Sequence, residues 1–198
     1  REGRLVDTSL ISRMVERCRL PIAVGGGIGN VDDASRLFVA GADKVIVNTA
    51  AVLNPSMIRP LAERFGAQSV VVSLDLKRNS KRGWVPVVRS GEEEVDLDFV
   101  YLLEALEANG AGEFIVTSVD REGTLSGLDL DMLKVVREVV KVPLIASGGA
   151  GNYLHLVELF LSIDLEGVGI GKMLALRDYD VVRIKAFLKG RGIPVREA

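Results

Sequence analysis

The sequence contains an internal repeat, and this repeat restricts the possible folds more than any other feature. Residues 21–30 read PIAVGGGIGN and residues 143–152 read PLIASGGAGN, so five of ten positions are identical at an offset of 122 positions. In both copies a short apolar run precedes the glycines, and a stretch of helical length follows them. A duplicated unit of about 120 residues that combines strands and helices is typical of a barrel built from two similar halves.

Apolar runs of strand length alternate with amphipathic stretches of helical length along the chain. The six runs that we predict as strands are 21–25, 44–48, 69–77, 113–120, 143–147 and 167–171. The predicted helices are 7–19, 31–40, 55–65, 96–109, 129–140, 153–162 and 178–190. The predicted strands are apolar on both faces, which is typical of parallel strands that are covered by helices. The alternation allows a doubly wound open sheet or a (β/α)8 barrel, and the repeat favours the barrel.

We therefore predict an α/β fold, a (β/α)8 TIM barrel of the half-barrel-repeat type. In the second copy two predicted strands precede Arg121, whereas nothing precedes the matching Arg1 in the first copy. The 198 residues thus correspond to six βα units, and we expect strands 1 and 2 of the barrel to be missing. We expect residues 1–198 to form a single, partial barrel domain that is truncated at its N-terminus, with an inserted hairpin or loop at 78–95 after barrel strand 5.

The composition excludes several classes of protein. Hydrophobic residues make up 48% of the chain and its formal net charge is −2, whereas disordered chains combine low hydrophobicity with high net charge. The 25 basic residues do not outnumber the 27 acidic ones, so we expect no nucleic-acid partner. The apolar runs are too short to cross a bilayer, and a single cysteine excludes a disulfide framework. We expect a cytoplasmic protein that does not bind membranes.

In a parallel barrel, functional residues lie at the carboxyl ends of the strands. Two glycine turns, at residues 25–29 and 147–151, occupy such positions. Their backbone amides, together with the start of the helix that follows each turn, suit a phosphate group, so we expect two phosphate subsites. The alternative is that the glycines merely form tight strand-to-helix turns. The sequence contains neither a dinucleotide-binding fingerprint nor a Walker A loop.

Asp75 ends a long apolar run, where a carboxylate is costly to bury unless it is used or paired. Two interpretations stay open for it: general acid–base catalysis, or a structural ion pair with Lys77 or Lys44. Asp120 likewise either positions a substrate or caps its own loop. The single histidine, His155, lies in a predicted helix away from the strand ends, and we expect a solvated residue rather than a catalyst. No residues have the spacing of metal ligands, so we expect no metal.

Five segments of the chain form a specific combination. They are 24–28 (VGGGI), 41–45 (GADKV), 48–52 (NTAAV), 118–124 (SVDREGT) and 146–151 (ASGGAG). With these segments, the chain resembles over essentially its whole length the cyclase subunit of imidazole glycerol phosphate synthase, from histidine biosynthesis. The resemblance implies a lyase that uses glutamine-derived ammonia. Its substrate is expected to be a bis-phosphorylated ribulosyl aminoimidazole carboxamide, and its products imidazole glycerol phosphate and an aminoimidazole carboxamide ribotide.

The resemblance also implies roles for individual residues, and no cofactor. Asp75 is implied to be one catalytic carboxylate, with a second catalytic aspartate in the missing N-terminal part. Lys44 and Glu113 are implied to line an ammonia entrance at the N-terminal face of the barrel, where a glutaminase subunit is expected to dock as a heterodimer. The implied substrate- and phosphate-binding residues are Gly27, Asn48, Thr49, Asp120, Glu122, Gly123, Thr124, Gly148, Gly149, Gly171 and Lys172.

The chain departs from the family pattern in three loops. Glu122 replaces an aspartate, Lys172 stands where a hydroxyl is usual, and the acidic run 92–94 stands where the family has basic residues. Two alternatives therefore stay open. One is a related barrel that supports ammonia-dependent acetamidino-sugar formation in surface polysaccharide biosynthesis, and the other is a non-catalytic scaffold that binds phosphate or a partner. We expect the 198-residue chain alone to be inactive, because two missing strands leave open sheet edges.

Overall fold

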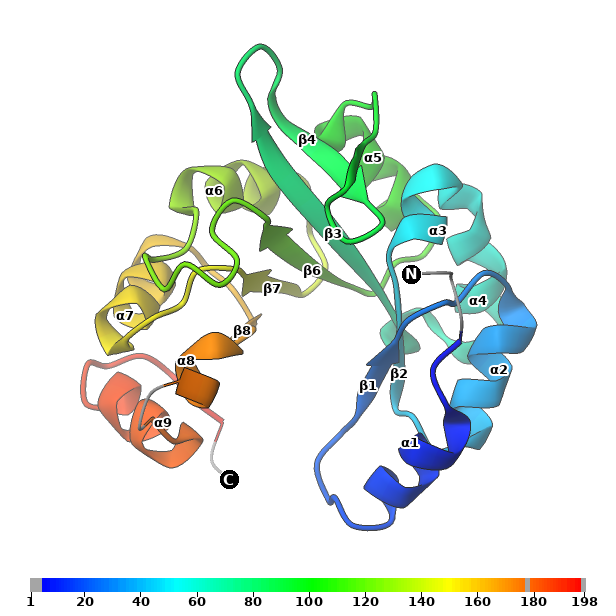
Figure 1. Cartoon of the computed structure of the whole chain (residues 1–198), viewed down its shortest axis with the longest axis horizontal. Coiled ribbons are helices and arrows are strands. Elements are labelled where there is room, and N and C mark those ends of the chain that lie inside the picture. The colour runs from blue at the N-terminus through cyan, green and yellow to red at the C-terminus, as the bar shows by residue number, and fades with distance from the viewer. Residues whose placement is uncertain (1–4, 177–178, 197–198) are drawn as a thin grey trace.

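The computed structural model describes residues 5–176 and 179–196, and in it six parallel strands form one curved sheet (Figure 1). The strands, in their hydrogen-bonded order, are β1 (Ala23–Gly25), β2 (Lys44–Val47), β3 (Val70–Asn79), β6 (Glu113–Ser118), β7 (Leu144–Ser147) and β8 (Gly167–Val168). Each overlaps a predicted strand, and the predicted fold of six βα units from a TIM barrel is confirmed. Arg1 and residue 178, where the last predicted helix begins, lie outside the described residues.

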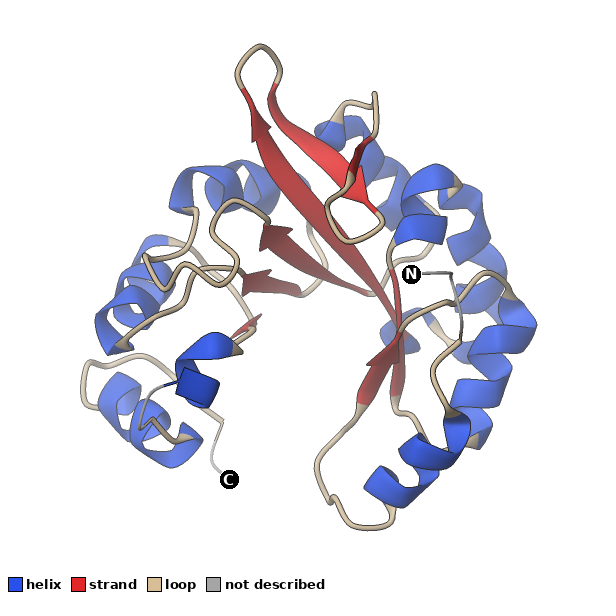
Figure 2. Cartoon of the chain, in the orientation of Figure 1, coloured by secondary structure: helices blue, strands red, loops and turns tan. Residues whose placement is uncertain are grey.

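Helices cover the outer face of the sheet (Figure 2). They are α1 (Thr8–Val15), α2 (Val31–Val39), α3 (Thr49–Leu53), α4 (Ile58–Phe65), α5 (Phe99–Ala108), α6 (Leu130–Val139), α7 (Tyr153–Ser162), α8 (Lys172–Leu176) and α9 (Val181–Lys189), with 3-10 turns η1 (Pro55–Met57) and η2 (Ala67–Ser69). The sequence does not predict α3 and α8, because five residues are too few to show a helical period. In the described part of the chain, no helix is long and apolar enough to span a membrane.

Along each strand the residues alternate between the outer face of the sheet, which packs against the helices, and the inner face, which lines the inside of the curved sheet. On β3, the outward residues Leu74 and Leu76 are fully buried in the hydrophobic core, whereas Ser73 and Asp75 face inward and are only half-buried. The expectation that the strands are apolar on both faces is wrong for the inner face, which is polar where it approaches either end of the barrel. Along β2 and β6 the inward residues are Lys44, Ile46 and Asn48, and Glu113, Ile115 and Thr117.

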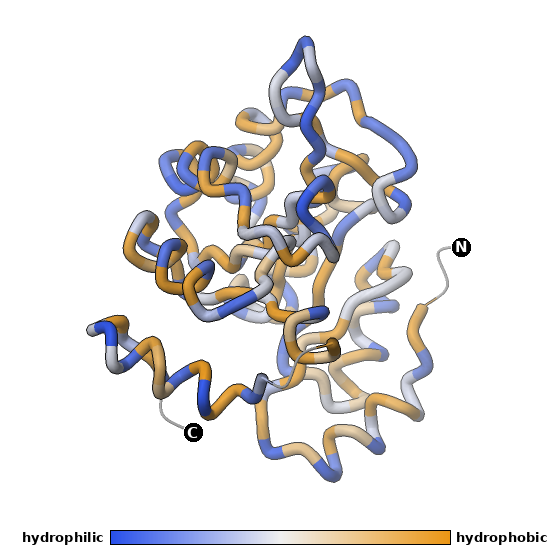
Figure 3. The backbone as a smooth tube through the Cα atoms, turned by 60° about the vertical axis from the view of Figure 1, so that its left-hand side comes forward, coloured by the Kyte–Doolittle hydropathy of each residue, from blue (hydrophilic) through white to orange (hydrophobic). Residues whose placement is uncertain are grey.

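β3 is the longest strand, and its second half continues into an antiparallel hairpin. β4 (Gly83–Val88) pairs with this half, and β5 (Glu93–Glu94) adds a short third strand. The turn between β3 and β4 projects from the sheet and is hydrophilic at its tip (Figure 3). The register of the hairpin places Val87 beside Asp75, so the turn after β4 lies next to the carboxyl end of the parallel part of β3.

The internal repeat of the sequence corresponds to a repeat of hydrogen bonds in the structure. The Asp43 carboxylate accepts a hydrogen bond from the backbone N–H of Ile22 at 2.8 Å, and the Glu166 carboxylate accepts one from Leu144 at 2.7 Å. In both halves a carboxylate just before one strand thus holds the start of the preceding strand. Because the backbone amide at the start of a strand needs a hydrogen-bond partner, the same solution is used twice.

We expect Leu74→Ala to lower the free energy of unfolding by about 2–5 kcal/mol, because this fully buried side chain leaves a cavity when it is truncated. Ser73→Ala, on the inner face of the same strand, is the matched control and is expected to change it by less than about 0.5 kcal/mol. Urea denaturation followed by circular dichroism measures both changes. Equal losses would contradict the assignment of the two faces.

Candidate functional site

The predicted site residues lie at the two ends of the barrel wall. Lys44 and Glu113 are the first residues of β2 and β6, at the amino ends of the strands. The other predicted residues follow the carboxyl ends of the strands or form their last positions. They are Gly27, Asn48, Thr49, Asp75, Asp120, Glu122, Gly123, Thr124, Gly148, Gly149, Gly171 and Lys172.

Asp75 lies on the inner face of β3 with neutral hydrogen-bond donors around its carboxylate. Asn48 Nδ2 donates to Asp75 Oδ2 at 2.9 Å, and the side chain of Thr117 donates to the same carboxylate. Burial raises the pKa of Asp75, and the hydrogen bonds from Asn48 and Thr117 oppose that rise only in part. Among the described residues, no ion pair joins Asp75 to Lys77 or Lys44, so the interpretation as a structural ion pair is wrong.

Thr117 belongs to the site although the sequence does not predict it. It lies directly opposite Asp75 in the register of β3 and β6. The sequence contains a signal that could have identified it. Every second residue of β6 counted from Glu113 lies on the inner face, and Thr117 is one of these residues. Oδ1 of Asn48 is buried and has no hydrogen-bond partner in the described structure. An unmet acceptor beside a half-buried carboxylate is a place where the donor group of a ligand fits.

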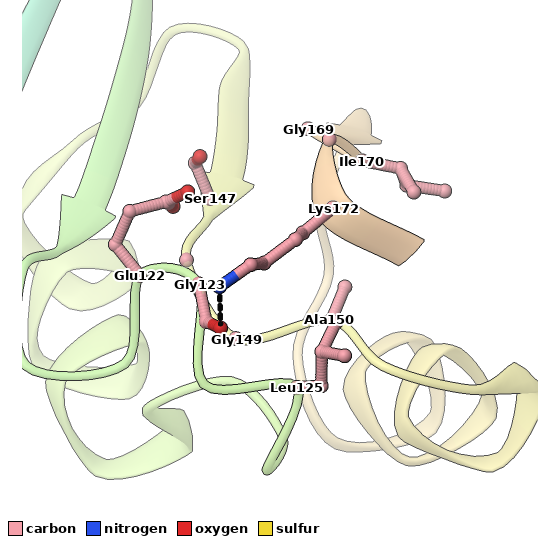
Figure 4. Close-up of a pocket in the computed structure, with 11 residues that line it drawn as sticks. Glu122, Gly123, Leu125, Ser147, Gly149, Ala150, Gly169, Ile170 and Lys172 are labelled. Carbon is pink, nitrogen blue, oxygen red and sulfur yellow. Dashed lines mark hydrogen bonds between the residues drawn. The ribbon is translucent and has the colours of Figure 1, made fainter. Parts of the chain in front are cut away.

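A cavity of about 260 Å³ lies at the carboxyl ends of β7 and β8 (Figure 4). Lys172 reaches from the start of α8 across this cavity, and its Nζ donates to the carbonyl oxygen of Gly123 at 2.8 Å. The glycine-rich lining carries one basic and one acidic side chain, and such a lining suits a small anionic group. The lining residues are Glu122, Gly123, Leu125, Ser147, Gly148, Gly149, Ala150, Gly169, Ile170, Gly171 and Lys172.

The glycines of the second turn are required by close packing of the backbone. A Cβ at Gly149 would lie 2.2 Å from the carbonyl oxygen of Gly127, and one at Gly148 would lie 2.6 Å from that of Ser118. Within the described structure, the amides of Gly148, Gly149 and Ala150 nevertheless donate no hydrogen bond. These glycines therefore form the turn and also leave backbone donors for a ligand.

The first glycine turn and the Asn48-Thr49 pair end the neighbouring strands β1 and β2. Thr49 Oγ1 accepts a hydrogen bond from the backbone N–H of Arg89 at 3.4 Å, which connects this end of the site to the turn after β4. Arg89 and Ser90 have φ values of 53° and 64°, uncommon for residues other than glycine. The hairpin thus borders the site at this corner with a strained turn.

Asp120 and Thr124 hold the loop after β6. Asp120 Oδ2 accepts a hydrogen bond from the backbone N–H of Arg78 at 2.6 Å, and the Thr124 hydroxyl donates to the carbonyl oxygen of Arg121 at 2.7 Å. Both side chains are exposed, and neither lines the cavity. Asp120 thus ties this loop to β3 rather than capping its own loop, and its role in positioning a substrate stays a prediction.

Lys44 and Glu113 form an ion pair on the inner face at the amino ends of β2 and β6. Because Ile46 and Ile115 follow them on the same face, an apolar layer separates this ion pair from Asp75. The arrangement places an ion pair at one end of the inner face and the Asp75 carboxylate at the other.

His155 is half-buried rather than solvated, so that expectation is wrong. The backbone N–H of Gly151 donates to its Nδ1 at 3.2 Å, and Asn152 Nδ2 lies 3.1 Å from its Nε2. The start of its own helix thus holds the imidazole, which lies close to the loop at Gly127. Among residues 5–176 and 179–196, no three His, Cys, Asp or Glu residues are grouped so that they could hold a metal ion.

Because burial raises the pKa of Asp75 in the folded state, the folded protein binds this proton more tightly than the unfolded chain does. Stability therefore falls as the pH rises through the interval between the two pKa values. We expect Asp75→Asn to raise the thermal unfolding midpoint at pH 7, and we expect this gain to vanish toward about pH 4, the ordinary pKa of aspartate. Calorimetry across this pH range measures the difference, and a gain that does not depend on pH would contradict it.

The chain is similar in sequence to known proteins. The model of a family described as "Histidine biosynthesis protein" matches residues 1–180. Imidazole glycerol phosphate synthase subunit HisF from Streptococcus mutans serotype c is 37% identical over 195 residues, which cover 98% of this chain and 78% of the relative. The subunits of the same name from Pyrobaculum aerophilum and Dictyoglomus thermophilum are 41% and 38% identical over 98% of this chain, covering 76% and 77% of their own lengths.

The similarity is high over nearly the whole chain, and it extends through both glycine turns and every strand of the sheet. The resemblance inferred from the sequence motifs is confirmed. At this identity and coverage, the chain belongs to the histidine biosynthesis protein family, among the HisF subunits of imidazole glycerol phosphate synthase.

Proposed function

We propose that the chain provides the cyclase activity of an imidazole glycerol phosphate synthase in histidine biosynthesis. The observation that carries the proposal is Asp75, a half-buried carboxyl with a raised pKa at the same end of the barrel as both glycine turns and Lys172. The substrate that the resemblance implies has two phosphates and a reacting centre between them. A site with a central acid–base group and anion-binding turns on either side matches that chemistry.

Asp75 acts as a general acid–base group in this proposal. A carboxyl whose pKa is raised by burial holds its proton to higher pH than an ordinary aspartate does, which suits a general acid–base group. Asn48 and Thr117 fix its orientation by donating to its oxygens. The free acceptor of Asn48 then takes a hydrogen bond from an N–H or O–H group of the substrate.

The phosphates bind in two places. The cavity beside Lys172 takes one of them, because the amides of Gly149 and Ala150 and the ammonium group of Lys172 supply donors and a positive charge. The first glycine turn, with Gly27, Asn48 and Thr49, takes the other. The other predicted residues of the loop after β6, Asp120, Glu122 and Thr124, shape the rim between these places.

The relatives are named as subunits, and we infer a second subunit for this chain as well. A glutaminase docks at the amino end of the barrel, where the ion pair of Lys44 and Glu113 lines the ammonia entrance in this proposal. Ammonia then passes along the inner face past Ile46 and Ile115 to reach Asp75. A reaction between soluble metabolites fits a cytoplasmic location.

We expect Asp75→Asn to lower turnover by about 10²–10⁴-fold, the usual contribution of a general acid–base group. Asp164→Asn, an exposed aspartate before β8, is the matched control and is expected to keep full turnover. The rate of imidazole glycerol phosphate formation is measured with ammonium salt in place of glutamine. The assay uses the complete synthase, so that every catalytic group of the enzyme is present. Full turnover of Asp75→Asn would contradict the proposed role.

We expect Lys172→Ala to weaken the binding of imidazole glycerol phosphate by about tenfold or more, because a charge-assisted hydrogen bond to phosphate is lost. Isothermal titration calorimetry of the 198-residue chain measures the dissociation constant. Lys134→Ala removes an exposed lysine on α6 and is the control for net charge. If the two variants bind equally well, Lys172 does not contact the phosphate.

A further inference from the structure

We infer that the two glycine turns are anion sites of unequal strength, that the turn at residues 147–151 is the stronger, and that Asp33 and His155 set much of the difference. This inference rests on the proposed function, because it ranks the two phosphate subsites that the function requires.

The two turns have similar backbones. The helix caps that follow them, Asn30 and Asn152, have φ and ψ values of −159° and 176°, and of −160° and 174°. The central glycines have φ values of 120° and 72° in the first turn, and of 92° and 99° in the second. Both turns therefore present their amides in a similar way, and a difference in anion affinity has to come from the side chains around them.

The side chain three positions after each cap forms the same hydrogen bond with a different charge. The N–H of Gly29 donates to Asp33 Oδ2 at 3.1 Å, and the N–H of Gly151 donates to His155 Nδ1 at 3.2 Å. Asp33 and His155 are equivalent residues, separated by the 122-residue offset of the repeat. In the first turn the acceptor is a carboxylate, whose negative charge repels an incoming phosphate. In the second turn a neutral acceptor forms the equivalent hydrogen bond without that repulsion.

Other charged side chains near the turns act in the same direction. The first turn of α2 contains a second carboxylate, Asp32, whereas the first turn of α7 contains none. After the next strand, the first half of the barrel has the neutral Thr49, and the second half has Lys172. The cavity of about 260 Å³ is lined by the second turn and not by the first.

Two charges oppose this ranking. Glu122 lines the cavity of the second turn, but the positive charge of Lys172 in the same lining offsets its charge there. Arg89 lies beside Thr49 at the first turn, but its Nε pairs with the Glu93 carboxylate at 3.3 Å. The balance therefore favours an anion at the second turn. A bis-phosphorylated substrate then attaches by the phosphate at this turn, and its other end is held more weakly.

The test is a titration of the ¹⁵N-labelled 198-residue chain with inorganic phosphate, in which the amide resonances of the glycines in both turns are followed. We expect the resonances of the second turn to saturate at lower phosphate concentration. Asp33→Asn keeps an acceptor for Gly29 and is expected to tighten binding at the first turn by about two- to fivefold. His155→Asp gives the second turn the carboxylate acceptor of the first turn. This change is expected to weaken phosphate binding at the second turn by a similar factor.

His155→Asn is the matched control, because it keeps a neutral acceptor, and it is expected to bind phosphate as the unchanged chain does. Equal dissociation constants at the two turns, or no response to Asp33→Asn and His155→Asp, would overturn the inference and leave the proposed phosphate subsites standing. If no amide at either turn responds to phosphate, the subsites of the proposed function are themselves wrong, and the inference falls with them. Should His155→Asp not fold, Asp33→Asn decides the ranking alone.

Discussion

Parallel hydrogen bonding between neighbouring strands sets the positions of the site residues in this protein. A parallel sheet brings the carboxyl ends of all its strands to one edge, and the staggered register decides which inward residues meet there. Asp75 lies opposite Thr117 for this reason, and Asn48 at the end of the adjacent strand reaches the same carboxylate. Residues from three strands thus form one polar cluster although the chain separates them by tens of positions.

The two faces of the sheet carry out different tasks. Leu74, Leu76 and their neighbours on the outer face bury their side chains under the helices and stabilise the wall. The inner face keeps polar groups at both of its ends, with Lys44 and Glu113 at one end and Asp75 at the other. The raised pKa of Asp75 shows the cost of this arrangement, since the folded protein tolerates an ionised carboxylate there less well than water does. A residue that reduces stability while it can exchange a proton is typical of a functional site.

The internal repeat supplies two similar backbones on which the side chains have diverged. Hydrogen bonds at Asp43 and Glu166 hold equivalent strand starts, and Asp33 and His155 hold equivalent turn amides. A backbone bond of this kind needs only an acceptor, so either a carboxylate or an imidazole satisfies it. The electrostatic field at the two turns does depend on that choice. A duplicated fold can therefore keep its geometry while its two anion sites become different.

The alternation of strands and helices, the glycine turns, the repeat and the family could all be predicted from the sequence, because they depend on short local patterns and, for the repeat, on the recurrence of one such pattern 122 positions later. The sequence did not determine the short helices α3 and α8, the inward position of Thr117, the contacts of His155 or the partners of Asp75. Those depend on strand register and on loops packing across the barrel mouth, so they arise from contacts between distant segments. Local periodicity shows which elements form, whereas the register of the strands and the packing of the loops set which side chains face one another where those elements end.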